Sequence, residues 1–308
     1  MRILVVGAGA VGGYFGGRLL EAGRDVTFLV RPRRAAELAR TGLSIRSPVR
    51  DLEVPAPPTV RTEEIQTPFD LILLSSKAYD LEGAIESVAP AVGPDTLILP
   101  LLNGLRHLDT LDARFGAQKV LGGLCLITST LDPEGRILHF TPLHTIVFGP
   151  RNHSSPPRLM AVRSILSDAG FEARYSDNIL QDMWEKWAFI AALAGLTCLM
   201  RSPVGDIIDT GSRPFAEEFV RECAAIASRN GFPPSPASVE RNLSFMTAPG
   251  SSLAASMLRD IERGSRTEAE HLIGDLLRRD PDGENASPLL RTAYAHLKAY
   301  ETRLTDRI

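Results

Sequence analysis

Residues 1–20 read MRILVVGAGAVGGYFGGRLL, and this stretch predicts how the fold begins. The aliphatic run Ile3–Val6 indicates a buried strand. Gly7, Gly9 and Gly12 follow in the spacing G-x-G-x-x-G, and apolar residues then recur at helical spacing. In a strand–turn–helix context these glycines permit a tight turn, close approach of a pyrophosphate and close helix packing, while the helix N-terminus attracts phosphate. The stretch therefore predicts a dinucleotide-binding turn.

Two simpler interpretations of this stretch are a secretory signal peptide and an ordinary glycine-rich turn. The signal peptide fits poorly, because glycines interrupt the apolar run and no A-x-A cleavage site closes it. The strand and helix expected on either side favour a dinucleotide site over an ordinary turn.

Composition limits the classes of protein that remain. A chain of 308 residues is too long for one ordinary core, which indicates two domains. The net charge of −3 gives no reason to expect a nucleic acid or a membrane surface as partner. The apolar run 187–200 is shorter than the ~20 residues of a membrane span and indicates a core helix. Three cysteines without zinc or paired-disulfide spacing favour reduced thiols in a cytoplasmic protein: Cys125, Cys198 and Cys223.

The pattern of elements changes once along the chain. Short apolar runs predict further strands at 25–30, 69–75, 97–102, 120–127, 145–149 and 171–175. Residues 43–62 are interpreted as a small β excursion at the sheet's edge and 152–157 as a loop, with His139 and His144 on a solvated strand face. From Asp177 onward helices are expected, at 178–200 (interrupted or ended near Gly195), 214–230, 235–247, 251–278 and 288–304. We expect an α/β chain with a doubly wound parallel (Rossmann) sheet in residues 1–176 and an all-helical domain in residues 177–308.

Three polar residues follow expected strands directly. Arg31 stands where NAD-binding units carry an acidic residue, and a guanidinium there suits the 2′-phosphate of NADP. Lys77 and Asn103 follow the next strands, and ligands of open parallel sheets bind at such carboxyl ends. The alternatives are a solvated basic loop at Arg31, Arg33 and Arg34, a surface lysine and an Asn-Gly turn.

In the expected helical domain, the sequence patterns that indicate reactive side chains are weaker than the glycine motif of the first domain. Lys186 begins a strongly apolar helix beside Trp184 and Trp187, and a partly desolvated ammonium can donate a proton near neutral pH. Pattern alone favours the alternative of a surface lysine whose stem lies along apolar residues. The pair at 256 and 260 shares a helix face, and Thr267 with Glu268 also fits ordinary helix capping. No metal-ligand motif such as H-E-x-x-H occurs, so no metal is expected.

The order of these motifs resembles that of the ketopantoate reductase family across essentially the whole chain. The matching motifs are V-G-A-G-A-V-G at 6–12, S-K-A at 76–78, N-G at 103–104, W-x-K at 184–186, S-M-L-x-D at 256–260 and T-E at 267–268. The resemblance implies NADPH-dependent reduction of a 2-oxo acid to a 2-hydroxy acid. It also implies a helical domain of the 6-phosphogluconate dehydrogenase C-terminal-like type.

The resemblance also implies roles for individual residues. Lys186 corresponds to the proton donor to the substrate carbonyl and Glu268 to an active-site carboxylate. The residues it implies for the cofactor are Gly7, Gly9, Ala10, Val11, Gly12, Arg31, Lys77 and Asn103. Those it implies for the substrate are Asn103, Ser256 and Asp260.

One departure from the family pattern concerns the substrate. The pattern W-x-K-x-x-x-N-x-x-x-N-P places two substrate-binding asparagines after the lysine, and this chain has Ile190 and Ala194 there, followed by Gly195. Replacing polar donors by apolar groups changes which substrates bind well. We therefore expect either ketopantoate reduction in pantothenate biosynthesis or reduction of a less polar 2-oxo acid, by a cytoplasmic homodimer. A non-catalytic NADP-binding sensor is the third interpretation.

Overall fold

A computed structural model describes residues 1–152 and 158–305 and confirms the expected fold class. The chain divides into two compact units, Met1–Ile179 and Leu180–Ile308. The first unit contains a parallel sheet with covering helices, and the second is built from helices over its described residues. The loop expected at 152–157 lies, apart from Asn152, outside the described residues.

The first unit is organised by a parallel sheet of order β5-β2-β1-β6-β7. Its strands are β1 (Arg2–Val6), β2 (Asp25–Leu29), β5 (Thr59–Val60), β6 (Phe69–Leu74) and β7 (Val92–Pro100). The ladder pairs Val6 with both Leu29 and Leu74, and pairs Leu74 with Pro100. Because these residues end their strands, the carboxyl ends of β2, β1, β6 and β7 lie side by side along one edge.

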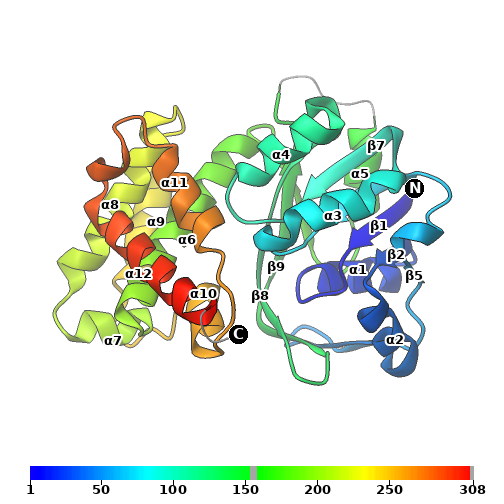
Figure 1. Cartoon of the computed structure of the whole chain (residues 1–308), viewed down its shortest axis with the longest axis horizontal. Helices are drawn as coiled ribbons and strands as arrows, with labels where there is room; N and C mark the ends of the chain where they lie inside the picture. Colours follow the sequence, from blue (N-terminus) through cyan, green and yellow to red (C-terminus); the bar gives the residue numbers. More distant parts are fainter. Residues whose placement is uncertain (153–157, 306–308) are drawn as a thin grey trace. The chain divides into compact units, whose positions relative to one another are not determined.

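Helices cover both faces of this sheet, as a doubly wound fold requires. Along β1, Ile3 and Val5 join the core that includes α1, while Leu4 and Val6 point to the opposite face and are also buried. Strands buried on both faces read as continuous apolar runs rather than as alternating ones. The helices of the unit are α1 (Gly12–Glu21), α2 (Pro32–Thr41), α3 (Leu81–Val88), α4 (Arg106–Phe115) and α5 (Leu159–Leu166) (Figure 1).

A second sheet corrects the expectation for residues 43–62. It has the order β10-β9-β3-β4, with β8 paired to β9. Only β5 of the 43–62 segment joins the edge of the parallel sheet. The physical reason is that Leu43 and Ile45 of β3 face α1 and complete the core on its far side. The strands are β3 (Leu43–Arg46), β4 (Leu52–Val54), β8 (Gly122–Leu131), β9 (Ile137–Gly149) and β10 (Glu172–Tyr175).

Helix α1 therefore lies between two sheets. Its Tyr14, Phe15 and Leu19 are fully buried. A Cβ at Gly17 would lie 2.9 Å from Ile45 Cδ1, so the absence of a side chain there favours close packing of the second sheet on the helix. The glycine-rich sequence of α1 thus serves packing on both sides as well as the turn before it.

The expectation that His139 faces solvent is wrong, and His144 is half-buried. His139 is 4% exposed, and its ring stacks on that of His144 with 5.7 Å between centroids. The Tyr14 hydroxyl lies 2.6 Å from His144 Nδ1, and the Ser47 hydroxyl lies 2.9 Å from His139 Nδ1. The second sheet lays this face of β9 on α1, which the strand pattern alone could not reveal.

The second unit is organised around α6 (Ile179–Met200), a long apolar helix. By length and composition α6 could cross a membrane, but 67% of its most apolar window is buried inside the fold, as in a core helix. The other helices of the unit are α7 (Val204–Asp209), α8 (Arg213–Arg229), α9 (Pro236–Met246), α10 (Ser256–Glu262), α11 (Asp275–Arg278) and α12 (Pro288–Thr305).

The single helix expected over 251–278 is wrong. Helix α10 ends at Glu262, Gly264 has a φ of +65°, and an irregular stretch leads to a π-helical turn, η5 (Glu270–Gly274), before α11. Glycine adopts this backbone conformation without strain and so ends the helix. The short 3₁₀ turns of the chain are η1 (Thr62–Glu64), η2 (Ala78–Asp80), η3 (Ala89–Ala91), η4 (Ala117–Lys119) and η6 (Glu284–Ala286).

The stacked pair of His139 and His144 predicts how stability depends on pH. Burial lowers the pKa of both rings, and the charge of Arg18 lowers it further, with His139 adding to the effect on His144. In the unfolded chain a histidine ionises near pH ~6.5. As the pH falls below that value, the unfolded chain takes up protons that the folded chain resists, so the free energy of unfolding decreases.

We expect the thermal midpoint to fall between about pH 7.5 and about pH 5.5, and to fall less in His144→Gln, whose amide can still bond Tyr14 but does not titrate. Circular dichroism melts across this range measure the slope. Equal slopes for the wild type and the variant would contradict the assignment.

Candidate functional site

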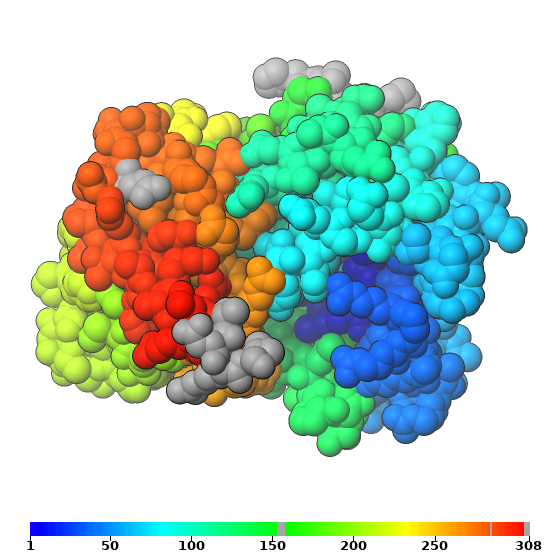
Figure 2. Space-filling model, viewed as in Figure 1, coloured from blue at the N-terminus to red at the C-terminus, as the bar shows by residue number. Residues whose placement is uncertain are grey.

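The sheet brings four predicted ligand positions to one edge. Arg31 follows β2, the glycine turn follows β1, Lys77 follows β6 and Asn103 follows β7, in the order of the strands. In Figure 2 the dark blue N-terminal residues lie recessed between the blue residues of α2, the cyan segment that contains α3 and the green β8–β9 hairpin. The surface of the first unit is therefore hollowed where these N-terminal residues are visible.

The glycine turn is held by hydrogen bonds to its carbonyl groups. Gly7 has a φ of +91°, a conformation that favours glycine. The Ser129 hydroxyl of β8 donates to Ala10 O at 3.1 Å, and the Arg34 guanidinium donates to Ala8 O at 3.0 and 3.2 Å. The Gly13 N–H donates to Gly9 O at 2.8 Å. The carbonyls of three consecutive peptide groups are thus satisfied within the protein.

Arg31, Arg33 and Arg34, which the alternative interpretation assigns to one solvated basic loop, are in different environments. The side chain of Arg31 is 77% exposed and pairs with Asp80 at 3.2 Å. Arg33 is also exposed. Arg34 is only 17% exposed and forms an ion pair with Glu37 at 2.9 Å. Of the three, Arg34 is turned inward against the glycine turn.

Lys77 and Asn103 begin the loops after their strands. Lys77 is exposed and precedes η2, and its carbonyl accepts the Asp80 N–H at 2.9 Å. Asn103 is half-buried and precedes Gly104, whose φ is +74°.

In the second unit Lys186 lies on the core helix α6. Its side chain is half-buried, and the neighbouring Trp184 and Trp187 are buried with 5.0 Å between ring centroids. A half-buried ammonium beside two buried tryptophan rings is less well solvated than one on an open helix surface.

Two buried hydrogen bonds fix other predicted residues to the same helix. The Trp187 indole N–H donates to Leu272 O at 2.8 Å, and the Leu272 N–H donates to Glu268 O at 2.9 Å. Farther along α6, the Thr197 hydroxyl accepts the Ala255 N–H at 3.3 Å, one residue before Ser256. The segments that carry Glu268 and Ser256 are therefore both anchored on the helix that carries Lys186.

The predicted residues on these two segments are at least partly accessible. Ser256 is exposed at the start of α10, and Asp260 is half-buried one turn later, as the four-residue spacing predicts. Thr267 is buried and caps the next helix, since its hydroxyl accepts the Ala269 N–H at 3.3 Å. Glu268 is half-buried and precedes the π-helical turn η5, a feature that is frequent at functional sites.

The positions where the family pattern has asparagines form part of an apolar surface. Ala194 is fully buried, and Ile190 is half-buried one turn after Lys186. Phe189, beside Ile190, packs on Phe245 of α9 at 6.0 Å between ring centroids, and Phe245 is 48% exposed. The part of α6 that follows Lys186 is therefore apolar, whereas Asp182 and Glu185 precede it.

Sequence reasoning missed the residues that support the site. Arg34, Ser129 and Trp187 each bond a backbone carbonyl far away along the chain, and no local pattern marks such a contact. Among the described residues, no three His, Cys, Asp or Glu side chains lie close enough together to hold a metal ion.

Comparison with known proteins confirms the resemblance drawn from the motifs. The family model "Ketopantoate reductase PanE/ApbA" matches residues 3–153, and "Ketopantoate reductase PanE/ApbA C terminal" matches residues 178–301. The chain is 42% identical over 302 residues to the uncharacterized oxidoreductase YkpB of Bacillus subtilis (strain 168), covering 98% of this chain and 99% of that protein.

Solved structures of similar proteins agree with this family assignment. The crystal structure of 2-dehydropantoate 2-reductase from Geobacter metallireducens GS-15 is 29% identical with a TM-score of 0.88, covering 97% of this chain and 99% of that one. A ternary structure of D-mandelate dehydrogenase with NADH and anilino(oxo)acetate has a TM-score of 0.88 at 23% identity, over 99% and 100% of the two chains, and supports the fold alone. With family models matched across both halves, the chain belongs to the ketopantoate reductase family of oxidoreductases.

Proposed function

We propose that this protein reduces a 2-oxo acid to a 2-hydroxy acid with NADPH, with Lys186 as the proton donor. The observation that carries the proposal is the half-buried position of Lys186 on α6, the helix to which the segments of Glu268 and Ser256 are tied. Ketopantoate, the substrate in pantothenate biosynthesis, is the first candidate. A cytoplasmic location is supported by three buried free cysteines, and a homodimer by the family resemblance.

The glycine turn has the shape that a dinucleotide needs. A Cβ added at Gly9 would have no described heavy atom within 4 Å beyond its chain neighbours, so the turn is open on that side. A Cβ at Gly12 would lie 2.4 Å from Gly7 O and 2.2 Å from Ser75 Oγ. Gly9 therefore leaves space for a pyrophosphate, whereas Gly12 is needed for the fold itself. A nicotinamide bound here supplies the hydride for the reduction.

Arg31 supports the preference for NADPH. Its exposed guanidinium has a planar set of donors that suits a phosphate, and its pair with Asp80 is a surface contact of small energy. We propose that Arg31 binds the 2′-phosphate, with Lys77 and Asn103 as further contacts to the cofactor.

Lys186 suits the chemistry of ketone reduction. As hydride reaches the carbonyl carbon, negative charge grows on the carbonyl oxygen, and an ammonium nearby stabilises this charge and then donates a proton. The half-buried position of Lys186 strengthens the interaction, because water screens it less. Glu268 is proposed as the accompanying active-site carboxylate, with Asn103, Ser256 and Asp260 as substrate contacts.

A second candidate substrate is a less polar 2-oxo acid. Ile190 replaces an asparagine of the family pattern, and Phe189 and Phe245 extend the apolar surface beside it. This surface can contact an aliphatic or aromatic side chain but cannot donate a hydrogen bond to a substrate hydroxyl.

The glycines predict separable effects on binding and folding. We expect Gly9→Ala to keep the wild-type melting temperature and lose most NADPH affinity, because its methyl group occupies the open side of the turn. Gly12→Ala, the matched control, loses stability because its methyl group meets the backbone. Calorimetric titration and thermal melts measure the two effects, and unchanged NADPH affinity in Gly9→Ala would contradict the proposed site.

Loss of the proton donor should slow catalysis without preventing cofactor binding. We expect Lys186→Ala to lower kcat for the best 2-oxo acid by about 10²–10⁴, while NADPH affinity stays within about twofold of the wild type. Absorbance of reduced nicotinamide follows turnover on ketopantoate, pyruvate, and branched and aromatic 2-oxo acids. Wild-type turnover by the variant would contradict the role of Lys186. A wild type that binds NADPH but reduces none of these acids would favour the non-catalytic sensor.

Substitution at Ile190 distinguishes the two substrate candidates. We expect Ile190→Asn to raise kcat/KM for ketopantoate relative to a branched 2-oxo acid by about tenfold or more, because the amide can pair with the substrate hydroxyl. Ile190→Ala, which makes space but adds no donor, is the control. An equal change in both variants would show that space, and not hydrogen bonding, sets the preference. The buried Ala194 is not substituted, since an asparagine there would lose ~1–3 kcal/mol of stability if unpaired.

A further inference from the structure

We propose that Arg34 is a positioning residue for the dinucleotide turn, because it links this turn to the tip of the β8–β9 hairpin; we call this link the brace. Arg34 does not bind the 2′-phosphate. The inference rests on the proposed dinucleotide binding. It separates Arg34 from Arg31, although both arginines belong to the same basic stretch of sequence.

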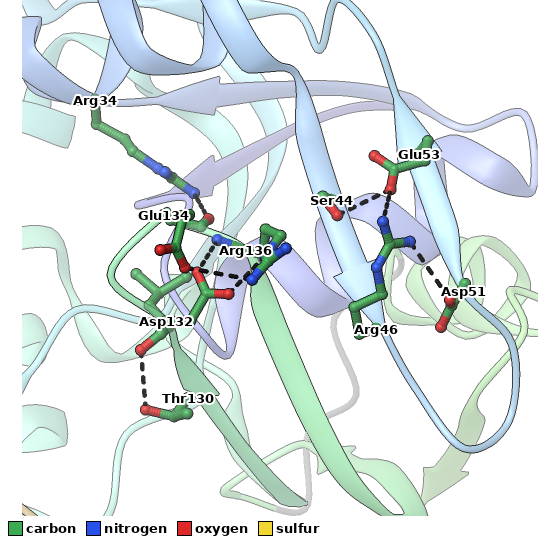
Figure 3. Close-up of polar contacts among 11 residues, drawn as sticks. Arg34, Ser44, Arg46, Asp51, Glu53, Thr130, Asp132, Glu134 and Arg136 are labelled. Carbon is green, nitrogen blue, oxygen red and sulfur yellow. Dashed lines mark hydrogen bonds and ion pairs between the residues drawn. The ribbon is translucent and has the colours of Figure 1, made fainter.

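All three nitrogens of the Arg34 guanidinium have partners inside the protein. Nε and Nη2 donate to Ala8 O at 3.2 and 3.0 Å, and Nη2 also donates to Gly135 O at 3.1 Å. Nη1 pairs with Glu37 Oε2 at 2.9 Å. Figure 3 shows the guanidinium directed at the hairpin turn. Because its nitrogens already have partners and the side chain is only 17% exposed, Arg34 has few N–H donors left to bind a phosphate.

The contact with Ala8 O determines where the next N–H points. In a planar trans peptide the C=O of one residue and the N–H of the next point in opposite directions. By holding Ala8 O, Arg34 turns the Gly9 N–H away from itself, and by holding Ala10 O, Ser129 does the same for the Val11 N–H. Together with the bond from Gly13 N–H to Gly9 O, these contacts fix three successive peptide planes. Fixed N–H groups of this kind bind anions without first losing conformational freedom.

The hairpin tip is a rigid support for the brace. Asp132 accepts the Arg136 N–H at 2.8 Å and its Nε–H at 2.6 Å, and the Gly135 N–H donates to Asp132 O at 3.0 Å (Figure 3). Gly135 has a φ of +80°, and a Cβ there would lie 2.0 Å from Glu37 Oε1 and 2.7 Å from Arg34 Nη1. The turn therefore fits closely against the Arg34–Glu37 pair.

Measured affinities for both dinucleotides test the assignment. We expect Arg34→Ala to weaken NADPH and NADH alike, by about tenfold or more, because the pyrophosphate contacts are common to both. Arg34→Lys, which can bond a carbonyl but lacks the planar fork, recovers part of both affinities. Arg31→Ala weakens NADPH and leaves NADH nearly unchanged. Arg40→Ala, on the exposed end of α2, is the matched control and changes neither affinity.

Two results would overturn the proposal. Loss of NADPH affinity alone in Arg34→Ala means that Arg34 reads the 2′-phosphate. Unchanged affinity for both dinucleotides, in a folded variant, means that the brace does not position the turn. If Arg34→Ala does not fold, Ser129→Ala removes the second brace from the hairpin side, and it should also weaken both dinucleotides by similar factors.

Hydrogen exchange separates this proposal from the proposed function. In the free protein, Arg34→Ala should speed amide exchange in residues 7–13 and leave exchange in α6 unchanged. A wild type that binds neither dinucleotide would contradict the proposed function, and exchange would still decide whether Arg34 orders the turn. Unchanged exchange at residues 7–13 would overturn the proposal.

Discussion

The turn between β1 and α1 satisfies the carbonyl groups of Ala8, Gly9 and Ala10 within the protein. A buried carbonyl without a partner loses the free energy of a hydrogen bond, so a glycine-rich turn that faces outward needs donors behind it. Arg34, Ser129 and the Gly13 N–H supply these donors from α2, from β8 and from α1 itself. Much of the first unit follows from this requirement, since the β8–β9 hairpin must reach the turn from the far side of α1.

In the second unit, one helix holds distant backbone segments in place by hydrogen bonds, as Arg34 and Ser129 do for the turn in the first unit. Helix α6 is apolar along most of its length and serves as the core around which the other helices pack. Two of its polar groups, the Trp187 indole and the Thr197 hydroxyl, bond the backbone of the segments that carry Glu268 and Ser256. Positions that are far apart in sequence are therefore held at set points along a rigid element, which is how catalytic groups keep their geometry.

The apolar character of α6 also bears on specificity. A helix can carry asparagines on a face that binds a substrate hydroxyl, or it can use that face for aliphatic and aromatic contacts. Ile190, Phe189 and Phe245 are of the second kind. In this family member the scaffold of the reductase is retained, and the chemical character beside the lysine differs from the family pattern.

Sequence alone determined the features that depend on neighbours along the chain. The apolar run before Gly7 indicated β1, helical spacing indicated α1 and α6, and the residues after each strand lie at one sheet edge because parallel strands end together. Tertiary structure alone decided the second sheet, the burial of His139 and the inward position of Arg34. Each of these depends on contacts between segments distant in sequence, such as β3 on α1 or the hairpin tip on α2, and hydrophobic periodicity carries no information about which distant segment will cover a given face.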